Sequence, residues 1–459
     1  MFNKKIGGKC MTGFSLIILL VVSIALLIFL INKVKLHPFL SILLTAYFYA
    51  IIAGVPFSEL DGIVKSGFGG LLGSIGIVIT LGTIIGLILE KSGAAITMAN
   101  VALKTFGKKS PSLAIAIVGW IVSIPVFCDS GFIILAPLKN SLAKASKQSM
   151  ITMTIALSAG LHVTHALVPP TPGPIAAAGN LGIENSLGLV ILVGIVVSIF
   201  ALVAGHWFAK YIGRKVDDSV LSVGTIDAAA AEESYGKLPS AFMSFMPIIL
   251  PVLLISMGTV LSLLGKGIAD TQIYSILMFI GTPTTALLIS TFLALPLLKG
   301  TSTKFGDLVT DGIKMAAPIL LITAAGGVFG TAIKATPIAE YIGSSLSGLS
   351  LGLLVPFIIS ACIKTAQGSG TTALVVTSSL VAPLLPSLGL AGTMGTVLTV
   401  MAIGAGAMTV SHSNDSYFWV VTQSTGMDTL TGYKTQTLGS LVTGIAAIAI
   451  TLILGFIFI

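Results

Sequence analysis

Apolar runs long enough to cross a lipid bilayer fill most of this chain of 459 residues. Hydrophobic residues make up 55% of it and charged residues only 9%, so water could not solvate it as an ordinary globular protein. A membrane helix needs about 20 apolar residues, whereas a barrel strand needs about 10 residues of alternating polarity. The runs here are long and do not alternate. The sequence therefore predicts an all-α polytopic membrane protein.

Short segments of small and polar residues interrupt these runs, two in each half of the chain. They lie at residues 127–131, 168–174, 366–372 and 411–415. The first segment in each half stands between apolar stretches too short to cross a bilayer alone. We therefore predict two re-entrant helical hairpins, at residues 111–142 and 351–385. The second segment should break a helix, because proline removes backbone donors and Ser411 to Asp415 are polar. This predicts broken helices at residues 149–184 and 391–425.

The same order of elements recurs in both halves. We predict a first repeat at residues 11–206, a polar linker at 207–240 and a second repeat at 241–458. Each repeat has five crossings when hairpins are not counted, together with one re-entrant hairpin and one broken helix. An odd number of crossings forces the second repeat to enter the membrane upside down, so we expect an inverted repeat.

Basic residues can orient this repeat in the membrane. With the N-terminus outside, most of the 24 Lys and Arg residues, Lys139 among them, fall on the cytoplasmic side, as expected for membrane proteins. The first hairpin would then open toward the cytoplasm and the second toward the outside. Lys4, Lys5 and Lys9 favour the opposite orientation.

Several functional classes are excluded by composition and motifs. The net charge of +8 is spread over short connections rather than gathered in one patch, so we expect no nucleic-acid partner. The cysteines Cys10, Cys128 and Cys362 have neither metal-ligand spacing nor a disulfide pattern. A glycine-rich phosphate loop ending in Lys-Ser or Lys-Thr is not evident. We therefore expect no metal, no cofactor and no direct use of ATP.

The breaks are the best candidates for a binding site. Unwound helix ends leave backbone N–H groups without partners and carry the positive end of the helix dipole, which suits an anion. The surrounding hydroxyl and amide groups fit a carboxylate that carries several hydroxyls. The predicted substrate-binding residues are Asp129, Ser130, Gly131, His165, Thr171, Gln367, Ser369, Gly370, Thr371, Thr372, Ser411, Ser413 and Asn414.

Ionisable residues at membrane depth are costly and often mark a site. We expect four of them, Asp129, His165, His412 and Asp415, to carry the coupling proton. Asp129 and Asp415 could instead cap the helix that follows. His162 lies one turn from His165 on the same helix stripe and could simply satisfy a carbonyl group in the bundle. Lys334 and Lys364 are expected to extend toward the membrane interfaces and not to act as ligands.

Three segments resemble a known family. The segments from Phe127 to Phe132, from Val168 to Ala178 and from Ser411 to Ser416 are similar to those of the gluconate:proton symporter (gluconate permease) family of the ion transporter superfamily. The resemblance implies proton-driven uptake of sugar acids across the bacterial inner membrane. It also implies a homodimer whose moving domains carry the hairpins past a scaffold, as an elevator does. Members of this family often have His where this chain has Thr171, and some relatives take other hydroxy acids or D-serine.

Three other functions are compatible with parts of the sequence. A sodium-coupled carboxylate carrier would use unwound carbonyl groups to hold sodium. An intramembrane enzyme would need Cys128 or a serine as nucleophile beside His165, but the motif order gives no activated pair. A passive channel would not accumulate its substrate. We expect a secondary transporter and not an enzyme.

Overall fold

A computed structural model describes residues 13–106, 110–216, 218, 221, 238–264, 271–299, 301, 303–338, 352–413 and 415–459. Within these ranges the chain forms helices and no β-strand, which confirms the predicted all-α class. The predicted linker lies largely outside the described residues. The helix before it continues to Ile212 and so includes the first residues assigned to that linker.

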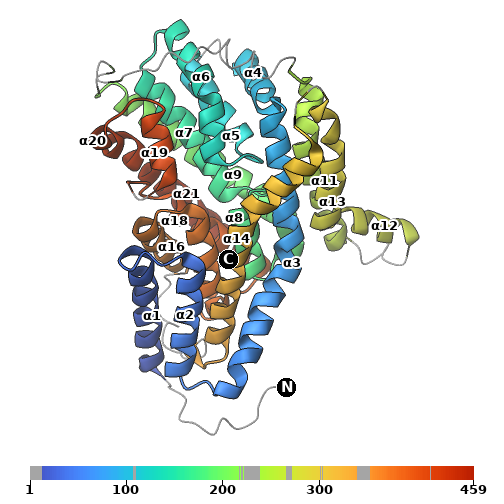
Figure 1. The fold of residues 1–459 in the computed structure, drawn as a ribbon, viewed down its shortest axis with the longest axis vertical. Coiled ribbons are helices and arrows are strands. Elements are labelled where there is room, and N and C mark those ends of the chain that lie inside the picture. The colour runs from blue at the N-terminus through green and yellow to red at the C-terminus, as the bar shows by residue number, and fades with distance from the viewer. Residues whose placement is uncertain are drawn as a thin grey trace.

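The first half contains nine labelled α-helices (Figure 1). They are α1 (Phe14–Asn32), α2 (Pro38–Ile52), α3 (Phe57–Lys91), α4 (Ala94–Phe106), α5 (Pro111–Val122), α6 (Cys128–Ser146), α7 (Met150–Leu167), α8 (Pro172–Asn180) and α9 (Leu187–Ile212). Helices α5 and α6 are the arms of the predicted first hairpin. Helices α7 and α8 are the two parts of the first predicted broken helix.

The described residues of the second half form a further set of helices. Its helices are α11 (Ala241–Leu264), α12 (Gln272–Ile280), α13 (Pro283–Leu293), α14 (Phe305–Lys334), α16 (Leu354–Gln367), α17 (Gly370–Val381), α18 (Thr393–Met408), α19 (Ser416–Gln423), α20 (Thr429–Gly432) and α21 (Leu438–Phe458), with a π-helical turn at Tyr433–Thr437. Helices α16 and α17 form the second predicted hairpin, and α18 and α19 flank the last break.

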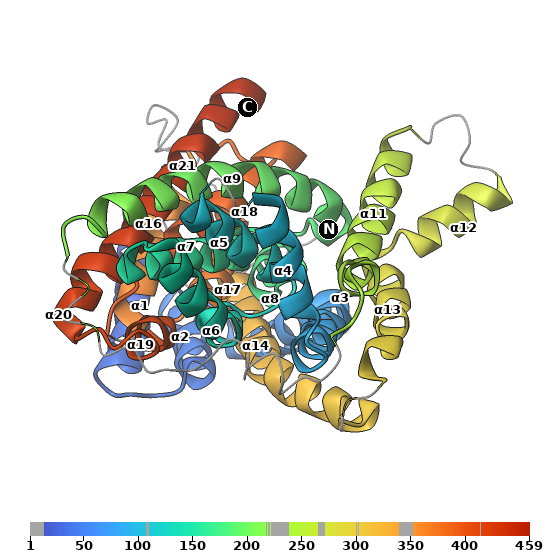
Figure 2. The same ribbon diagram turned by 90° about the horizontal axis from the view of Figure 1, so that it is seen from above.

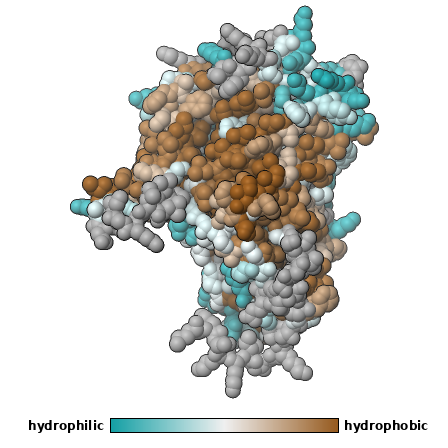
Figure 3. Space-filling view, turned by 180° about the vertical axis from the view of Figure 1, so that it is seen from behind, coloured by the Kyte–Doolittle hydropathy of each residue, from teal (hydrophilic) through white to brown (hydrophobic). Residues whose placement is uncertain are grey.

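Seven stretches in the described part of the chain are long and apolar enough to cross a membrane. The pair formed by α12 and Pro283–Leu298, bent by 66°, would make an eighth if it is one span. Two predicted crossings are short, since α2 has 15 residues and α18 has 16. Figure 3 shows apolar side chains gathered over the middle of one face, with hydrophilic ones at its upper end. This pattern is typical of a surface that faces lipid.

Long helices α3 and α14 pack along each other through the middle of the molecule (Figure 1). A Cβ on Gly67 would lie 2.6 Å from the carbonyl oxygen of Gly327, so glycine permits the close approach of these two backbones. Helices α1 and α2 lie at one end, whereas α4 to α7 lie at the other, and α12 projects to one side (Figures 1 and 2).

Packing follows the proposed repeat. Helix α5 packs against α7 in the first half, and α16 packs against α18 in the second. Helices α7 and α18 in turn contact the closing helices α9 and α21, which also contact each other. These matched contacts support two equivalent halves, and the inverted relation between the halves remains a prediction.

The contact between α5 and α7 gives a prediction for stability. A Cβ on Gly160 would lie 2.1 Å from the carbonyl oxygen of Ala116 and 2.9 Å from the amide nitrogen of Trp120. We therefore expect Gly160→Ala to cost about 1–3 kcal/mol, because it overpacks a backbone crossing. Gly73→Ala is the control, since nothing lies within 4 Å of its added Cβ. Thermal unfolding in detergent should show a lower midpoint for Gly160→Ala alone, and equal midpoints would contradict this packing.

Candidate functional site

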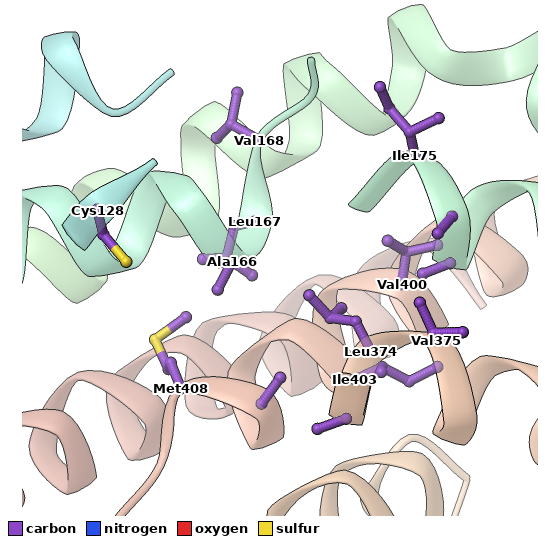
Figure 4. Packing of buried hydrophobic residues seen from close by; sticks show 14 of the residues in the cluster. Cys128, Ala166, Leu167, Val168, Ile175, Leu374, Val375, Val400, Ile403 and Met408 are labelled. Atoms are coloured by element: carbon purple, nitrogen blue, oxygen red, sulfur yellow. The ribbon is translucent and has the colours of Figure 1, made fainter. Parts of the chain in front are cut away.

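The four breaks meet in the interior, each next to another. The ring of Phe127, at the first hairpin tip, lies 5.6 Å from the ring of His165 near the end of α7. A Cβ on Gly173, at the start of α8, would lie 2.7 Å from Leu374 Cδ1 in α17. Figure 4 shows Ala166 and Leu167 of α7 above the helix that carries Ile403 and Met408, and a Cβ on Gly404 would lie 2.8 Å from Leu167 Cδ2. The first hairpin tip therefore lies next to the end of α7, and the start of α8 lies next to α17.

The second hairpin and the last break are also in contact. Nε2 of His412 lies 2.8 Å from the carbonyl oxygen of Thr365 in α16. The first hairpin reaches the same break from the other side, because the Phe132 and Tyr417 rings are 6.2 Å apart. The Asp129 carboxyl group lies next to Ser416, in the first turn of α19. We call the residues Asp129, His165, Lys364, Ser411 and Asp415 the central polar cluster.

A buried ion pair occupies one side of this cluster. Lys364 Nζ lies 2.6 Å from Asp415 Oδ2, and the two side chains are only 1% and 6% exposed. Lys364 also donates a hydrogen bond to the carbonyl oxygen of Gly368, and Ser411 donates one to Asp415 Oδ2. The prediction that Lys364 extends toward an interface is therefore wrong. Its ammonium group lies inside because a carboxylate and a tip carbonyl compensate its charge.

Asp415 has the capping role that the sequence left open. Its Oδ1 accepts a hydrogen bond from the Tyr417 backbone nitrogen at 3.1 Å, and the residue is the N-cap of α19. Asp129 differs, because Phe127 is the N-cap of α6 and its side chain forms no capping bond. Asp129 stands in the first turn of α6, where its charge is favourable to the helix dipole.

Two buried polar atoms of the cluster have no hydrogen-bond partner among the described residues. They are Oδ1 of Asp129 and Nδ1 of His165. Asp129 Oδ2 receives a long contact of 3.6 Å from Cys128 Sγ, and the Ser416 side chain lies next to the carboxyl group. Buried polar groups in native structures are nearly always paired, so unpaired ones need an explanation. A bound polar ligand would supply the missing partner for both atoms.

Most of the other predicted binding residues are at least partly exposed to solvent. Ser369 is exposed and caps α17, accepting a hydrogen bond from the Thr372 nitrogen at 3.2 Å and another from the Thr372 hydroxyl at 3.1 Å. The Gln367 amide donates to the Ser369 carbonyl oxygen. Ser130, Gln367, Gly370, Thr371, His412 and Ser413 are all partly exposed. Asn414 lies outside the described residues.

Three of the predicted substrate-binding residues form hydrogen bonds with other groups of the protein. The buried Thr171 hydroxyl lies 2.7 Å from the carbonyl oxygen of Val168 and 3.1 Å from that of His165, so it satisfies the end of α7. The amide of Gly131 donates to the carbonyl oxygen of Phe127 at 2.8 Å. Ser413 Oγ accepts a hydrogen bond from the Tyr433 hydroxyl at 2.8 Å.

The prediction for Lys139 is also wrong. The sequence places it in a cytoplasmic connection, but α6 continues to Ser146 and the Lys139 side chain is fully buried. Its Nζ donates to the Thr154 hydroxyl at 3.0 Å and lies 5.5 Å from the centre of the Phe132 ring. The helical spacing of Phe132, Leu135 and Lys139 places all three on one face, and this signal could have found it.

His162 is buried beside an aromatic ring. It is 6% exposed, and its ring lies 5.2 Å from the ring of Tyr417. The Tyr417 hydroxyl donates to the Ser158 carbonyl oxygen at 3.1 Å, and Ser158 Oγ donates to Gln436 Oε1 at 2.7 Å. This network ties α7 to α19 and to the π-helical turn, behind the central polar cluster.

A polar cluster between helix ends, together with seven apolar spans among the described residues, is typical of a membrane transport protein. The family model described as GntP family permease matches residues 15–457. The chain belongs to this family of secondary transporters, and it is a multi-pass protein of the bacterial inner membrane.

Relatives along nearly the whole chain agree with this assignment. The inner membrane permease YgbN of Escherichia coli is 33% identical over 96% of this chain and 98% of its own. The D-serine transporter DsdX of E. coli is 32% identical over 95% and 98%. The gluconate permease of Pseudomonas aeruginosa is 31% identical over 95% and 96%.

The fold is also known from a solved structure. The YdaH transporter of Alcanivorax borkumensis superposes with a TM-score of 0.61 at 13% sequence identity, covering 88% of this chain and 90% of its own. At this identity the likeness concerns the fold alone.

Proposed function

We propose that the protein is a proton-coupled symporter that imports a small hydroxylated carboxylate, such as gluconate or a related sugar acid. The observation that carries this proposal is the pair of unpartnered buried atoms, Asp129 Oδ1 and His165 Nδ1, beside the ion pair of Lys364 and Asp415. A carboxylate and an imidazole without partners can take up a proton. The unwound segments around them supply N–H and hydroxyl donors for an anion.

The relatives narrow the substrate class. The names of two of them state gluconate and D-serine, and both compounds carry a carboxylate and at least one hydroxyl. Ser130, Thr371 and Gln367 are partly exposed and offer hydroxyl and amide groups next to the cluster. A sugar acid would use more of these groups than D-serine does.

The packing also supports an elevator motion. The hairpins and broken helices pack on one another and on α9 and α21, whereas α3 and α14 form a long pair together with α2 and contact α8 and α17 along its side. We propose that the first group moves as a body past the second, which would expose the site to each side in turn. We also propose a homodimer, in which the α3 and α14 pairs form the fixed scaffold.

Uptake into proteoliposomes tests the proposed function. Purified protein with an imposed pH gradient and no sodium should accumulate labelled gluconate above its external concentration, and a protonophore should abolish the accumulation. D-serine and short hydroxy acids serve as competing substrates. Accumulation that requires sodium would support the sodium-coupled alternative, and equilibration without accumulation would indicate a channel.

Thr171 gives a prediction about specificity. Its side chain lies between the end of α7 and the start of α8, next to His165, and a larger polar ring there would reach toward the cluster. We expect Thr171→His to change the order of preference among sugar acids. Thr171→Ser is the control, because it keeps the hydroxyl bonds to Val168 and His165. Competition against labelled gluconate measures the order, and identical profiles for the two variants would contradict a role for Thr171 in selection.

A further inference from the structure

The tip of the second hairpin holds the ammonium group of Lys364 among oxygen atoms. Lys364 lies in the last turn of α16, and the chain reverses at Gly368, whose φ of +88° favours glycine. This turn aims the Gly368 carbonyl oxygen back at Lys364 Nζ. Asp415 Oδ2 approaches Nζ from the last break at 2.6 Å. One carbonyl and one carboxylate, from two unwound segments, thus surround a single positive charge.

Oxygen atoms of this kind also bind a metal cation. Hard cations prefer carboxylate and carbonyl oxygens, and in transporters with broken helices the unwound carbonyl groups hold the coupling sodium ion. Here the protein supplies the positive charge itself, through a side chain that cannot leave. Lys364 and Asp415 are both almost fully buried, so a mobile cation has no need to enter to neutralise the carboxylate.

We propose that Lys364 is a tethered cation that occupies the place of a coupling sodium ion, and that this one residue makes the transporter independent of sodium. The inference deepens the proposed function and rests on it, because it explains why a proton and not sodium would be the coupling ion. It predicts that the oxygen atoms around Nζ will bind a small cation once the lysine side chain is shortened.

Physical reasoning supports this outcome. Removing the ammonium group leaves the Asp415 carboxylate buried, with Ser411 and the Tyr417 amide as its remaining donors. An uncompensated buried charge is strongly destabilising. Shortening lysine to alanine also leaves space where Nζ and its methylene groups stood. A sodium ion, or a small alkylammonium ion, would fill that space and restore the charge.

The test compares thermal unfolding of purified protein in sodium chloride and in choline chloride at equal ionic strength. The unaltered protein should have the same midpoint in both salts. Lys364→Ala should have a lower midpoint in choline and recover by about 3 °C or more in sodium, saturating with concentration as a bound ligand does. Methylammonium chloride provides a second probe that should act in the same direction.

Two variants control the test. Lys364→Ala with Asp415→Asn removes both charges and should respond equally to the two salts. Lys139→Ala also shortens a buried lysine, but its partners are the Thr154 and Thr425 hydroxyls and not a carboxylate, so it should gain no sodium response. Equal midpoints of Lys364→Ala in both salts would overturn the proposal. So would failure of Lys364→Ala to fold in either salt while the double variant folds.

This readout needs neither substrate nor transport. A failure of the unaltered protein to accumulate gluconate would therefore refute the proposed function without affecting the salt comparison. In the converse case, proton-driven uptake by the unaltered protein together with no sodium response of Lys364→Ala would refute only the tethered cation.

Discussion

Asp415→Asn should be the most destabilising single substitution in the central polar cluster. It leaves the Lys364 ammonium group buried with no carboxylate partner, and breaking a buried ion pair in this way costs about 3–5 kcal/mol. Asparagine caps a helix about as well as aspartate does, so α19 keeps its cap and the loss reports the charge alone. We expect little folded protein, or a strongly lowered unfolding midpoint in detergent.

Two further variants isolate this effect. Asp428 caps α20 at the surface, where its Oδ1 accepts a hydrogen bond from the Thr431 nitrogen at 2.8 Å, so Asp428→Asn should leave the midpoint unchanged. Asp415→Asn combined with Lys364→Met removes both charges and fills the space with an apolar chain. This pair should recover most of the lost stability. If it were no more stable than Asp415→Asn alone, the ion pair would not be the cause.

Sequence alone could predict the helices and their breaks, because both depend on local properties. Run lengths, the prolines from Pro169 to Pro174 and the glycine at the second tip fix where a helix can and cannot continue. Helices α5 to α8 and α16 to α19 accordingly begin and end near the predicted breaks, whereas the re-entrant course of the hairpins stays a prediction. Asp415 caps the next helix, as its residue type suggests.

Side chains whose environment is set by distant segments could not be predicted in this way. Lys364 looks like a lysine near a helix end, and only the fold brings Asp415 from another break to its ammonium group. Lys139 likewise meets Thr425 from the far end of the chain. The lengths of the apolar runs and the residue types in the breaks therefore say nothing about which charges pair in the interior.

The hydroxyl groups that bind substrate could not be identified from the sequence either. Thr171 was chosen because it stands in a proline-rich break, but its hydroxyl is committed to the backbone oxygens that this break leaves unpaired. A break exposes carbonyl groups as well as N–H groups, and nearby hydroxyls satisfy them first. Residue type and position therefore overestimate how many polar side chains remain available to a substrate.

Asp129→Asn should abolish accumulation of substrate while leaving the protein folded. Asparagine has almost the same shape as aspartate, and Asp129 forms no ion pair among the described residues, so no buried counter-charge is left alone. The change removes the carboxyl group that would take up the coupling proton. Uptake driven by a pH gradient should fall to the level of empty liposomes. Exchange of labelled for unlabelled substrate, which needs no net proton movement, should persist.

The surface supplies a matched control for this substitution. Asp61 pairs with Lys65 at 2.7 Å, with both side chains mostly exposed, and exposed pairs contribute little. Asp61→Asn should therefore leave both uptake and exchange unchanged. Undiminished accumulation by Asp129→Asn would remove Asp129 as the proton carrier and leave His165, the other cluster residue with an unpartnered buried atom, as the group to substitute next. Loss of exchange together with accumulation would instead assign Asp129 to substrate binding, because only a binding residue is needed in both assays.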